Sequence, residues 1–369
     1  MREQSLSPQK YLTLLLSLIL SGLLALAGLS FYVRPLEGDL TRMGGYAERD
    51  FGNNMPRQLL AGDIVLSNAY DKYYDVVVIG DSFSRSGLWQ SYLRQKTGYS
   101  FTTLHWDNAS LETVMANPIF KQSPPKLVIA EIGVRDLPFR FAGQKAECAS
   151  EPPEKFVKGT PLAFVETPVK FVDVSRPTVP RLKDINMKFA LFFLENKLLR
   201  IVFHGRFDNV KSYPLTRADL FSNRKSDEIL LLQTWFDEKL WTEAEISNAI
   251  CRTLDLQARV QANGKTMFIL LPIPGKNAAY AKYIVKPDFA NTESINQAWA
   301  VAPISAPRLD KMLEKAIDSG EKDVYLPNDT HFGTRGYQLA AAAVVDFLAG
   351  RSASGTFGSA FSDKPGTDY

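Results

Sequence analysis

Short apolar runs alternate with amphipathic segments between residues 73 and 350. The apolar runs stand at 75–80, 100–106, 126–133, 265–274 and 323–327. Helical patterns stand at 87–96, 110–117, 225–264 and 308–320, and a long apolar helix follows the last run. Short β-branched runs are typical of strands buried on both faces of a sheet. Their alternation with helices predicts an α/β domain with a mainly parallel sheet.

A longer apolar segment precedes this domain. Residues 11–33 contain no charged side chain, and about 20 apolar residues are enough to cross a bilayer core. Arg2 and Lys10 lie before the segment, so the positive-inside rule keeps residues 1–10 in the cytoplasm and the rest outside it. We therefore expect a single-pass signal-anchor in the inner membrane, with the body of the protein in the periplasm. Cleavage after Ala25-Leu26-Ala27 is an alternative, and it exports the body as well.

Three further segments have their own patterns. Residues 34–72 are polar with scattered apolar side chains, Tyr46 and Phe51 among them, and are predicted to pack on the domain. Residues 137–225 lack regular alternation and form a predicted insertion, which contains an apolar helix suited to a core or a lid. Residues 351–369 are small and polar, and are predicted to be disordered.

Composition excludes several classes of function. The net charge is +3, from 43 basic and 40 acidic residues, without a basic stripe, so no nucleic-acid partner is expected. The three histidines are dispersed without metal-ligand spacing, so no metal site and no cofactor are expected. Cys148 and Cys251 would lie in an oxidising compartment, where a disulfide and two separate thiols are both open alternatives.

Three residues suggest nucleophilic chemistry. Ser82 directly follows the strand predicted at 75–80, and Asp329 and His331 follow the strand predicted at 323–327. Open α/β sheets bind ligands at the carboxyl ends of their strands. A serine needs a base within hydrogen-bond reach, and a carboxylate orients a histidine base. The pattern therefore predicts a Ser82–His331–Asp329 triad at one end of the sheet.

The same stretches carry a family resemblance. "VVVIGDSFSRSG" resembles the first block of the SGNH (GDSL-type) hydrolases, and "YLPNDTHFGTRGYQLAA" resembles their closing block. In detail the chain is similar to the extracytoplasmic alginate and polysaccharide O-acetyltransferase branch. "EIGVRDL" resembles that branch's E-x-x-x-R segment, with Glu131 and Arg135, and "LPIPGKNAAYAKYI" resembles its P-x-P-x-K-x-x-x-Y segment. The resemblance implies a three-layer SGNH-like domain at residues 73–350, in which Ser82 is the nucleophile.

The chain departs from the family pattern around the oxyanion hole. The second block offers Asn108 and Ala109 in place of the usual glycine, and the third block offers Arg135 in place of asparagine. An arginine can stabilise an oxyanion by its charge, or it can be a structural partner of Glu131, and both alternatives are open. The D-x-H motif follows the serine, which is the order of the ordinary SGNH superfamily and not that of the alginate enzymes.

The resemblance implies an O-acetyltransferase that modifies an exported polysaccharide through an acyl-enzyme. Because acetyl-CoA is absent outside the cytoplasm, it also implies a multispanning membrane acyltransferase as the acetyl donor. A carbohydrate acetylesterase, with water as acceptor, is the first alternative. A non-catalytic glycan-binding or scaffold protein with the same fold is the second.

Overall fold

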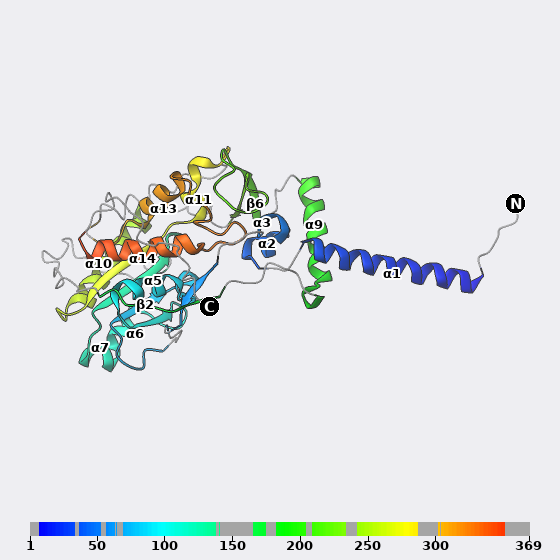
Figure 1. Ribbon diagram of the computed structural model, residues 1–369. Helices are drawn as coiled ribbons and strands as arrows, with labels where there is room; N and C mark the ends of the chain where they lie inside the picture. Colours follow the sequence, from blue (N-terminus) through cyan, green and yellow to red (C-terminus); the bar gives the residue numbers. More distant parts are fainter. Residues whose placement is uncertain are drawn as a thin grey trace.

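The computed structural model describes residues 7–33, 37–52, 57–62, 64, 69–137, 140, 165–174, 182–203, 209–233, 242–286, 302 and 304–350 (Figure 1). The tail at 351–369 and Cys148 lie outside these residues. Cys251, in a described helix, is disulfide-bonded.

The helices and strands follow in chain order. The helices are α1 (Pro8–Val33), α2 (Asp39–Gly44), α3 (Glu48–Phe51), α4 (Ser82–Arg85), α5 (Leu88–Thr97), α6 (Leu111–Ala116), α7 (Pro118–Gln122), α9 (Met187–Phe203), α10 (Glu243–Gln261), α11 (Lys276–Ala279), α13 (Leu309–Asp318) and α14 (Thr334–Leu348). The strands are β1 (Leu59–Ala61), β2 (Val76–Gly80), β3 (Phe101–His105), β4 (Leu127–Gly133), β5 (Phe171–Asp173), β6 (Val210–Pro214), β7 (Glu228–Leu232) and β8 (Met267–Ile273).

A four-stranded parallel sheet organises the domain, in the order β3-β2-β4-β8. Because side chains alternate along a strand, Val76 and Val78 enter the hydrophobic core on one face, and Val77 and Ile79 enter the core on the other. Every residue of β2 is buried. The continuous apolar runs in the sequence are therefore strands covered on both faces, as predicted.

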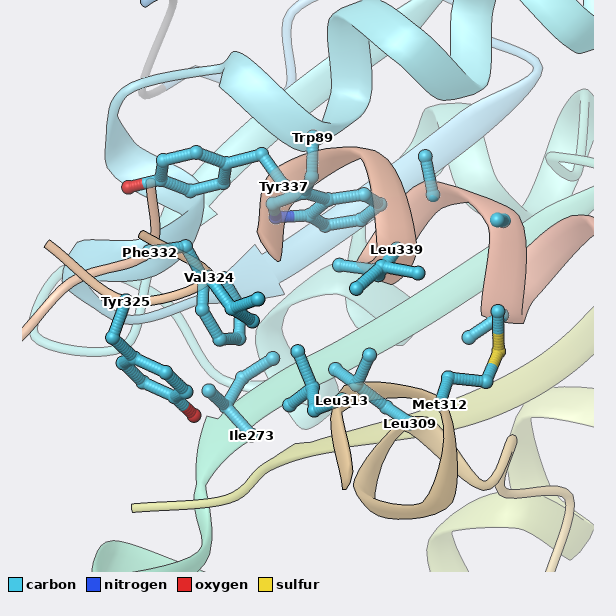
Figure 2. Close-up of a cluster of buried hydrophobic side chains, with 14 of the residues drawn as sticks. Trp89, Ile273, Leu309, Met312, Leu313, Val324, Tyr325, Phe332, Tyr337 and Leu339 are labelled. Carbon is cyan, nitrogen blue, oxygen red and sulfur yellow. The ribbon is translucent and has the colours of Figure 1, made fainter. Parts of the chain in front are cut away.

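Helices cover both faces of this sheet. Side chains of α5, α13 and α14 pack on one face, and side chains of α6, α7 and α10 pack on the other. Figure 2 shows part of the first core, where Trp89 of α5, Leu313 of α13 and Leu339 of α14 gather near Ile273 at the end of β8. The domain thus has three layers, and the predicted α/β class with a parallel sheet is confirmed.

Two predicted elements are wrong. Residues 323–327 do not extend the sheet: Tyr325 forms an isolated bridge with Phe332, and Gly333 N–H donates to the Val324 carbonyl at 3.0 Å. The backbone groups of the segment bond partly within its own loop and partly to other segments, since the Asp323 N–H donates to the Leu220 carbonyl at 3.1 Å and the Tyr325 N–H to the Tyr280 hydroxyl at 3.3 Å. The first part of the helix predicted at 225–264 is strand β7, which pairs with β6. The helix α10 begins only after Thr242, whose capping box with Glu245 marks its start.

Among the described residues, α1 is the one helix long and apolar enough to cross a membrane. It extends away from the domain (Figure 1), and only Ser30 and Val33 are buried along it. Such a helix is suited to a membrane anchor or a signal sequence. The helix α9 is not the core helix that was one of its two predicted uses, because only Phe189 and Ala190 are buried in it. It packs against the C-terminal end of α1 through Phe189, Val33 and neighbouring side chains.

The segment after α1 packs on the domain, as predicted. Leu40 of α2 and Phe51 of α3 form a small core with Val210 of β6 and Leu230 of β7. The Tyr46 ring packs edge-on against Phe51, with ring centroids 5.5 Å apart. Residues 37–52 are therefore part of the folded structure and not a free linker.

The close packing around Gly80, at the end of β2, can be tested by substitution. A Cβ at Gly80 would lie 2.5 Å from the Ser84 Cβ and 2.5 Å from a Glu131 carboxylate oxygen. Gly80→Ala should therefore lower the free energy of unfolding by about 1–3 kcal/mol, the usual cost of overpacking, measured as a lower melting temperature. Gly62→Ala is the control, because its Cβ would meet its nearest atom at 3.4 Å. An unchanged melting temperature for Gly80→Ala would contradict this packing.

Candidate active site

The turn after β2 presents Ser82. Asp81 caps α4, because its side chain accepts the Phe83 N–H at 2.9 Å. The second carboxylate oxygen of Asp81 accepts the Gly133 N–H at 2.9 Å, which ties this turn to the end of β4. Ser82 is the first residue of α4 and is exposed. The turn is therefore held from beneath while the serine hydroxyl faces outward.

Glu131 holds the turn from inside the domain. Its buried carboxylate accepts the Ser84 hydroxyl and, at 3.1 Å, the Asp81 N–H. Burial, together with the charge of Asp81, raises the pKa of Glu131 well above its ordinary value. Arg135 forms its ion pair with Asp136 at 3.3 Å. Glu131 therefore supports the serine turn, since the hydrogen bonds of its carboxylate are with Ser84 and Asp81.

The predicted triad is assembled in the structure. His331 Nε2 lies 2.8 Å from Ser82 Oγ, and His331 Nδ1 lies 2.6 Å from Asp329 Oδ1. With Asp329 accepting from Nδ1–H, the Nε2 lone pair is left to accept the Ser82 hydroxyl proton. The His331 ring also packs on Phe83, with centroids 4.8 Å apart, so hydrogen bonds at its two nitrogens and this ring contact together fix its orientation. These residues are arranged for proton transfer from Ser82 to His331.

The charges around His331 support a basic imidazole. Burial alone would lower the pKa of His331, but its hydrogen bond with Asp329 and the charge of Asp329 outweigh burial and raise it above 6.5. Asp39 and Asp81 add to this increase. Burial alone would raise the pKa of Asp329, but its interactions with His331 hold it well below its usual range. Asp329 is therefore ionised beside a histidine whose protonated form it stabilises.

A buried lysine holds the loop that carries Asp329 and His331. Lys276 Nζ, from α11, donates to the carbonyls of Leu326 at 2.7 Å, Pro327 at 3.0 Å and Asp329 at 3.2 Å. Burial lowers the pKa of Lys276 to about 7, against the opposing effect of carboxylates, Asp329 first among them. This lysine belongs to the P-x-P-x-K-x-x-x-Y segment noted in the sequence, and its position here is structural.

The segment after α1 reaches the same loop from the other side. Asp39 N–H donates to Asp329 Oδ2 at 3.2 Å, and the Asp39 carboxylate accepts the Thr330 N–H at 2.8 Å and the Thr330 hydroxyl at 2.5 Å. Burial and the charge of Asp329 raise the pKa of Asp39. Asp39 therefore positions the middle of the D-T-H motif, although it lies 290 residues before Asp329.

Asn328 completes this attachment. Its carbonyl accepts the N–H groups of Leu40 and Thr41 at 3.1 and 3.3 Å. Its side-chain amide donates at 2.8 Å to Glu48, a buried carboxylate that also accepts the Gly38 N–H at 2.8 Å. A Cβ at Gly38 would collide with Asn328, so only glycine allows this close approach.

A small pocket opens beside Ser82. It is lined by the turn after β2, by the end of β4 with Arg135, by Pro274 and Gly275 after β8, and by Thr330. The Ser82 N–H stands at the start of α4, where the helix itself provides no acceptor. Of the residues predicted to serve the oxyanion hole, Arg135 therefore lines this pocket, and the Ser82 N–H stands beside it as a further candidate donor.

Asn108 and Ala109 are not brought to it. Their N–H groups donate to the His105 carbonyl at 2.9 and 3.0 Å, and neither residue lines the pocket. Ala109, which stands in place of the family's glycine, is therefore not placed to donate to the oxyanion hole, because the chain turns back on itself directly after β3. Without the family's glycine, this turn directs its amide groups toward its own strand end.

The site also contains one group of potential metal ligands. Asp39, Asp329 and His331 offer ligand atoms within 4.8 Å of one another, the one such group among the described residues. Hydrogen bonds within the triad and to Thr330 already engage these atoms. The arrangement is accounted for without a cation.

No protein-family profile matches the sequence, and comparison with characterised proteins and with solved structures finds no match. The resemblance to the SGNH superfamily therefore stays a prediction, which depends on the motifs and on the geometry described above.

Sequence reasoning missed the residues that hold the triad loop from the side of α1. Asp39, Glu48 and Asn328 are single polar residues without a motif, and their neighbours carry no periodic pattern. The one available signal was the position of Asn328 directly before the D-T-H motif. The pairing of that motif with residues 37–48 arises only in the folded chain.

Removal of a carboxylate near His331 should change the pKa of its imidazole. Asp39→Asn removes a negative charge that stabilises the imidazolium, so the pKa of His331 should fall. Asp329→Asn should lower it further, because Asp329 is the nearer and stronger partner. The measurement is a pH titration of the imidazole resonances by NMR.

Asp255→Asn on α10 is the control for this titration. Its carboxylate pairs with Arg259 at 3.3 Å, so the pKa of His331 should not change. An unaltered pKa in Asp39→Asn would show that Asp39 is electrostatically separate from the triad.

Proposed function

We propose that this protein is a membrane-anchored, extracytoplasmic O-acetyltransferase that modifies a hydroxyl group of an exported polysaccharide through an acyl-enzyme. The observation that carries the proposal is the hydrogen-bonded chain from exposed Ser82 through His331 to ionised Asp329. The resemblance of both motif-bearing segments to SGNH enzymes supports the same chemistry.

The proposed reaction has two half-reactions. Ser82 Oγ attacks the acetyl carbonyl of the donor while His331 Nε2 takes the hydroxyl proton, and His331 then gives this proton to the leaving oxygen of the donor. In the second half, His331 removes the proton of a sugar hydroxyl, the sugar oxygen attacks the acetyl-serine, and the proton returns to Ser82. The negative oxygen of each tetrahedral intermediate faces the Ser82 N–H and Arg135.

The position of the site supports transfer from a membrane-bound donor. Gly38 and Asp39, which pack on the triad loop, follow the end of α1 at Val33 by five and six residues. Five residues span at most about 18 Å. If α1 is a membrane anchor, the triad loop lies close to the bilayer surface. A multispanning acyltransferase in the same membrane is the proposed acetyl donor.

Ser82→Ala tests the nucleophile. In the full chain, hydrolysis of p-nitrophenyl acetate should fall by at least about 10³-fold, as expected when the nucleophile of a serine triad is removed. Mass spectrometry should find an acetyl group on Ser82 in the unchanged protein and none in the variant. Ser123→Ala is the control, since Ser123 is exposed and precedes β4 at the opposite end of the strand. Equal rates for Ser82→Ala and the unchanged protein would exclude the catalytic proposal and leave a glycan-binding or scaffold role.

The same assay with an oligosaccharide acceptor separates transfer from hydrolysis. A transferase should move the acetyl group from Ser82 to the oligosaccharide, detected as a product heavier by one acetyl group. Release of acetate alone, at a rate that the oligosaccharide does not change, would assign the site to an acetylesterase.

Arg135 and Asn108 provide a matched pair for the oxyanion hole. Arg135→Ala should lower kcat for the chromogenic ester by about 10²-fold, the usual loss for one oxyanion donor, because Arg135 lines the Ser82 pocket. Asn108→Ala should leave kcat unchanged, since Asn108 lies outside that pocket. A large loss in Asn108→Ala with none in Arg135→Ala would contradict this assignment and would place the second block at the oxyanion hole.

A further inference from the structure

Exposed large apolar side chains are concentrated on two helices. Of the described residues outside α1 and 182–203, those with exposed large apolar side chains are Met43, Tyr73, Val165, Val172 and Val174. The helix α9 alone has eight: Met187, Leu191, Leu194, Leu198, Leu199, Ile201, Val202 and Phe203. Soluble proteins rarely expose apolar side chains so close together, and such a patch indicates an interaction surface.

Most of these side chains form one stripe along α9, which we call the α9 stripe. It consists of Met187, Leu191, Leu194, Leu198, Ile201 and Val202. At 100° per residue, these positions fall within an arc of about 100° around the helix. Leu198 and Ile201 are the most exposed members, at 61% and 66%. The stripe is as continuous as the face that a helix normally buries in a core.

The opposite side of α9 faces the protein. Phe189 is buried with Val33 of α1 and Ala47, and Phe192 packs on the same cluster. Farther along the helix, Arg200 donates to the Gly44 and Gly45 carbonyls and lies over the Tyr46 ring, 3.8 Å from its centroid. These contacts hold α9 on the domain with the α9 stripe directed away from it.

The α9 stripe lies at the end of the membrane-crossing surface of α1. Figure 1 shows α9 lying across the axis of α1 at its C-terminal end, and the Asn186 N–H donates to Ser30 Oγ at 2.7 Å. Tyr11 and Tyr32, both exposed, stand near the two ends of α1. At 1.5 Å per residue their separation is about 31 Å, close to the thickness of a bilayer core. Tyrosines favour the two membrane interfaces, and α9 lies at the level of the second.

The charges of α9 suit the same environment. Lys188 and Lys197 are exposed and flank the α9 stripe on its two sides, and exposed Glu195 lies beside Lys188 at the same border. Lysines in this position extend their ammonium groups toward lipid phosphates while their methylene chains stay on apolar surface. The helix has 17 residues, the lower limit for crossing a bilayer, and it carries four charged side chains, Lys188, Glu195, Lys197 and Arg200, so it is not suited to a membrane span.

We propose that α9 is a second membrane contact, an amphipathic helix that lies in the plane of the bilayer interface with its stripe in the lipid. Continuity with the apolar surface of α1 is the reason to assign this surface to lipid and not to another protein. The inference rests on the proposed insertion of α1, and the experiment below tests the two helices separately.

The test places a fluorescent probe at single cysteines. Leu194→Cys and Leu198→Cys in the full chain are labelled with an environment-sensitive dye and reconstituted into vesicles of phosphatidylcholine and phosphatidylglycerol that contain a nitroxide-labelled lipid. Leu18→Cys within α1 reports insertion of the anchor. Lys121→Cys, at the far end of the domain in α7, reports a position in water. The unsubstituted protein, treated with the same dye, shows how much of the signal comes from its native cysteines.

The expected result is a blue-shifted emission that the nitroxide lipid quenches at Leu18, Leu194 and Leu198, without a shift or quenching at Lys121. Quenching at Leu18 but not at Leu194 or Leu198 would overturn the proposal for α9 and leave the anchor in place. Absence of quenching at all four positions would overturn both. If the cysteines of Leu194→Cys and Leu198→Cys are protected from labelling by the dye in native membranes but not in these vesicles, the stripe binds a protein partner. This result would also overturn the proposal.

Discussion

One buried ammonium group holds the backbone on which the candidate triad depends. The loop with Asp329 and His331 lies beyond the edge of the sheet, so no neighbouring strand satisfies its carbonyl groups. Three of these carbonyls accept from Lys276 Nζ instead. A buried carbonyl without a partner costs about 1–3 kcal/mol, so the loop conformation that brings His331 to Ser82 is the one that keeps this lysine fully bonded.

A second group of contacts acts on the same loop from the opposite side. Asn328 and Thr330 form hydrogen bonds with the residues that follow α1. The Glu48 carboxylate accepts hydrogen bonds both from Asn328 in this loop and from Gly38 after α1. The candidate active site is therefore built from the two ends of the described chain as well as from the sheet. Mutations between residues 37 and 52 should be interpreted as changes to the site and not to a linker.

The parallel sheet and the triad were predictable because each depends on local signals. A buried strand such as β2 has a continuous apolar run, which ends directly before Ser82. Asp329 and His331 follow the short apolar segment 323–327, although this segment is not a strand of the sheet. The supports of the triad were not predictable, since Asp39 and Lys276 act through contacts between distant segments. The prediction that α9 is a core helix failed for a related reason. An apolar stripe has the same pattern whether it faces a core or a lipid, and only the fold distinguishes the two.

Two non-parallel helices constrain a protein more than one anchor does. In the proposed arrangement, α1 alone would leave the domain free to tilt relative to the bilayer normal, whereas α9 lying flat in the interface limits this tilt. Arg200 of α9 bonds to Gly44 at the end of α2, and Asp39 at the start of α2 bonds to Asp329. Ser82 would then keep a nearly constant height above the lipid headgroups. If the proposed function is correct, a long polysaccharide would receive acetyl groups only on the sugars that pass Ser82 at this height. The positions of the acetyl groups along the polysaccharide would then depend on the path that it takes away from the membrane.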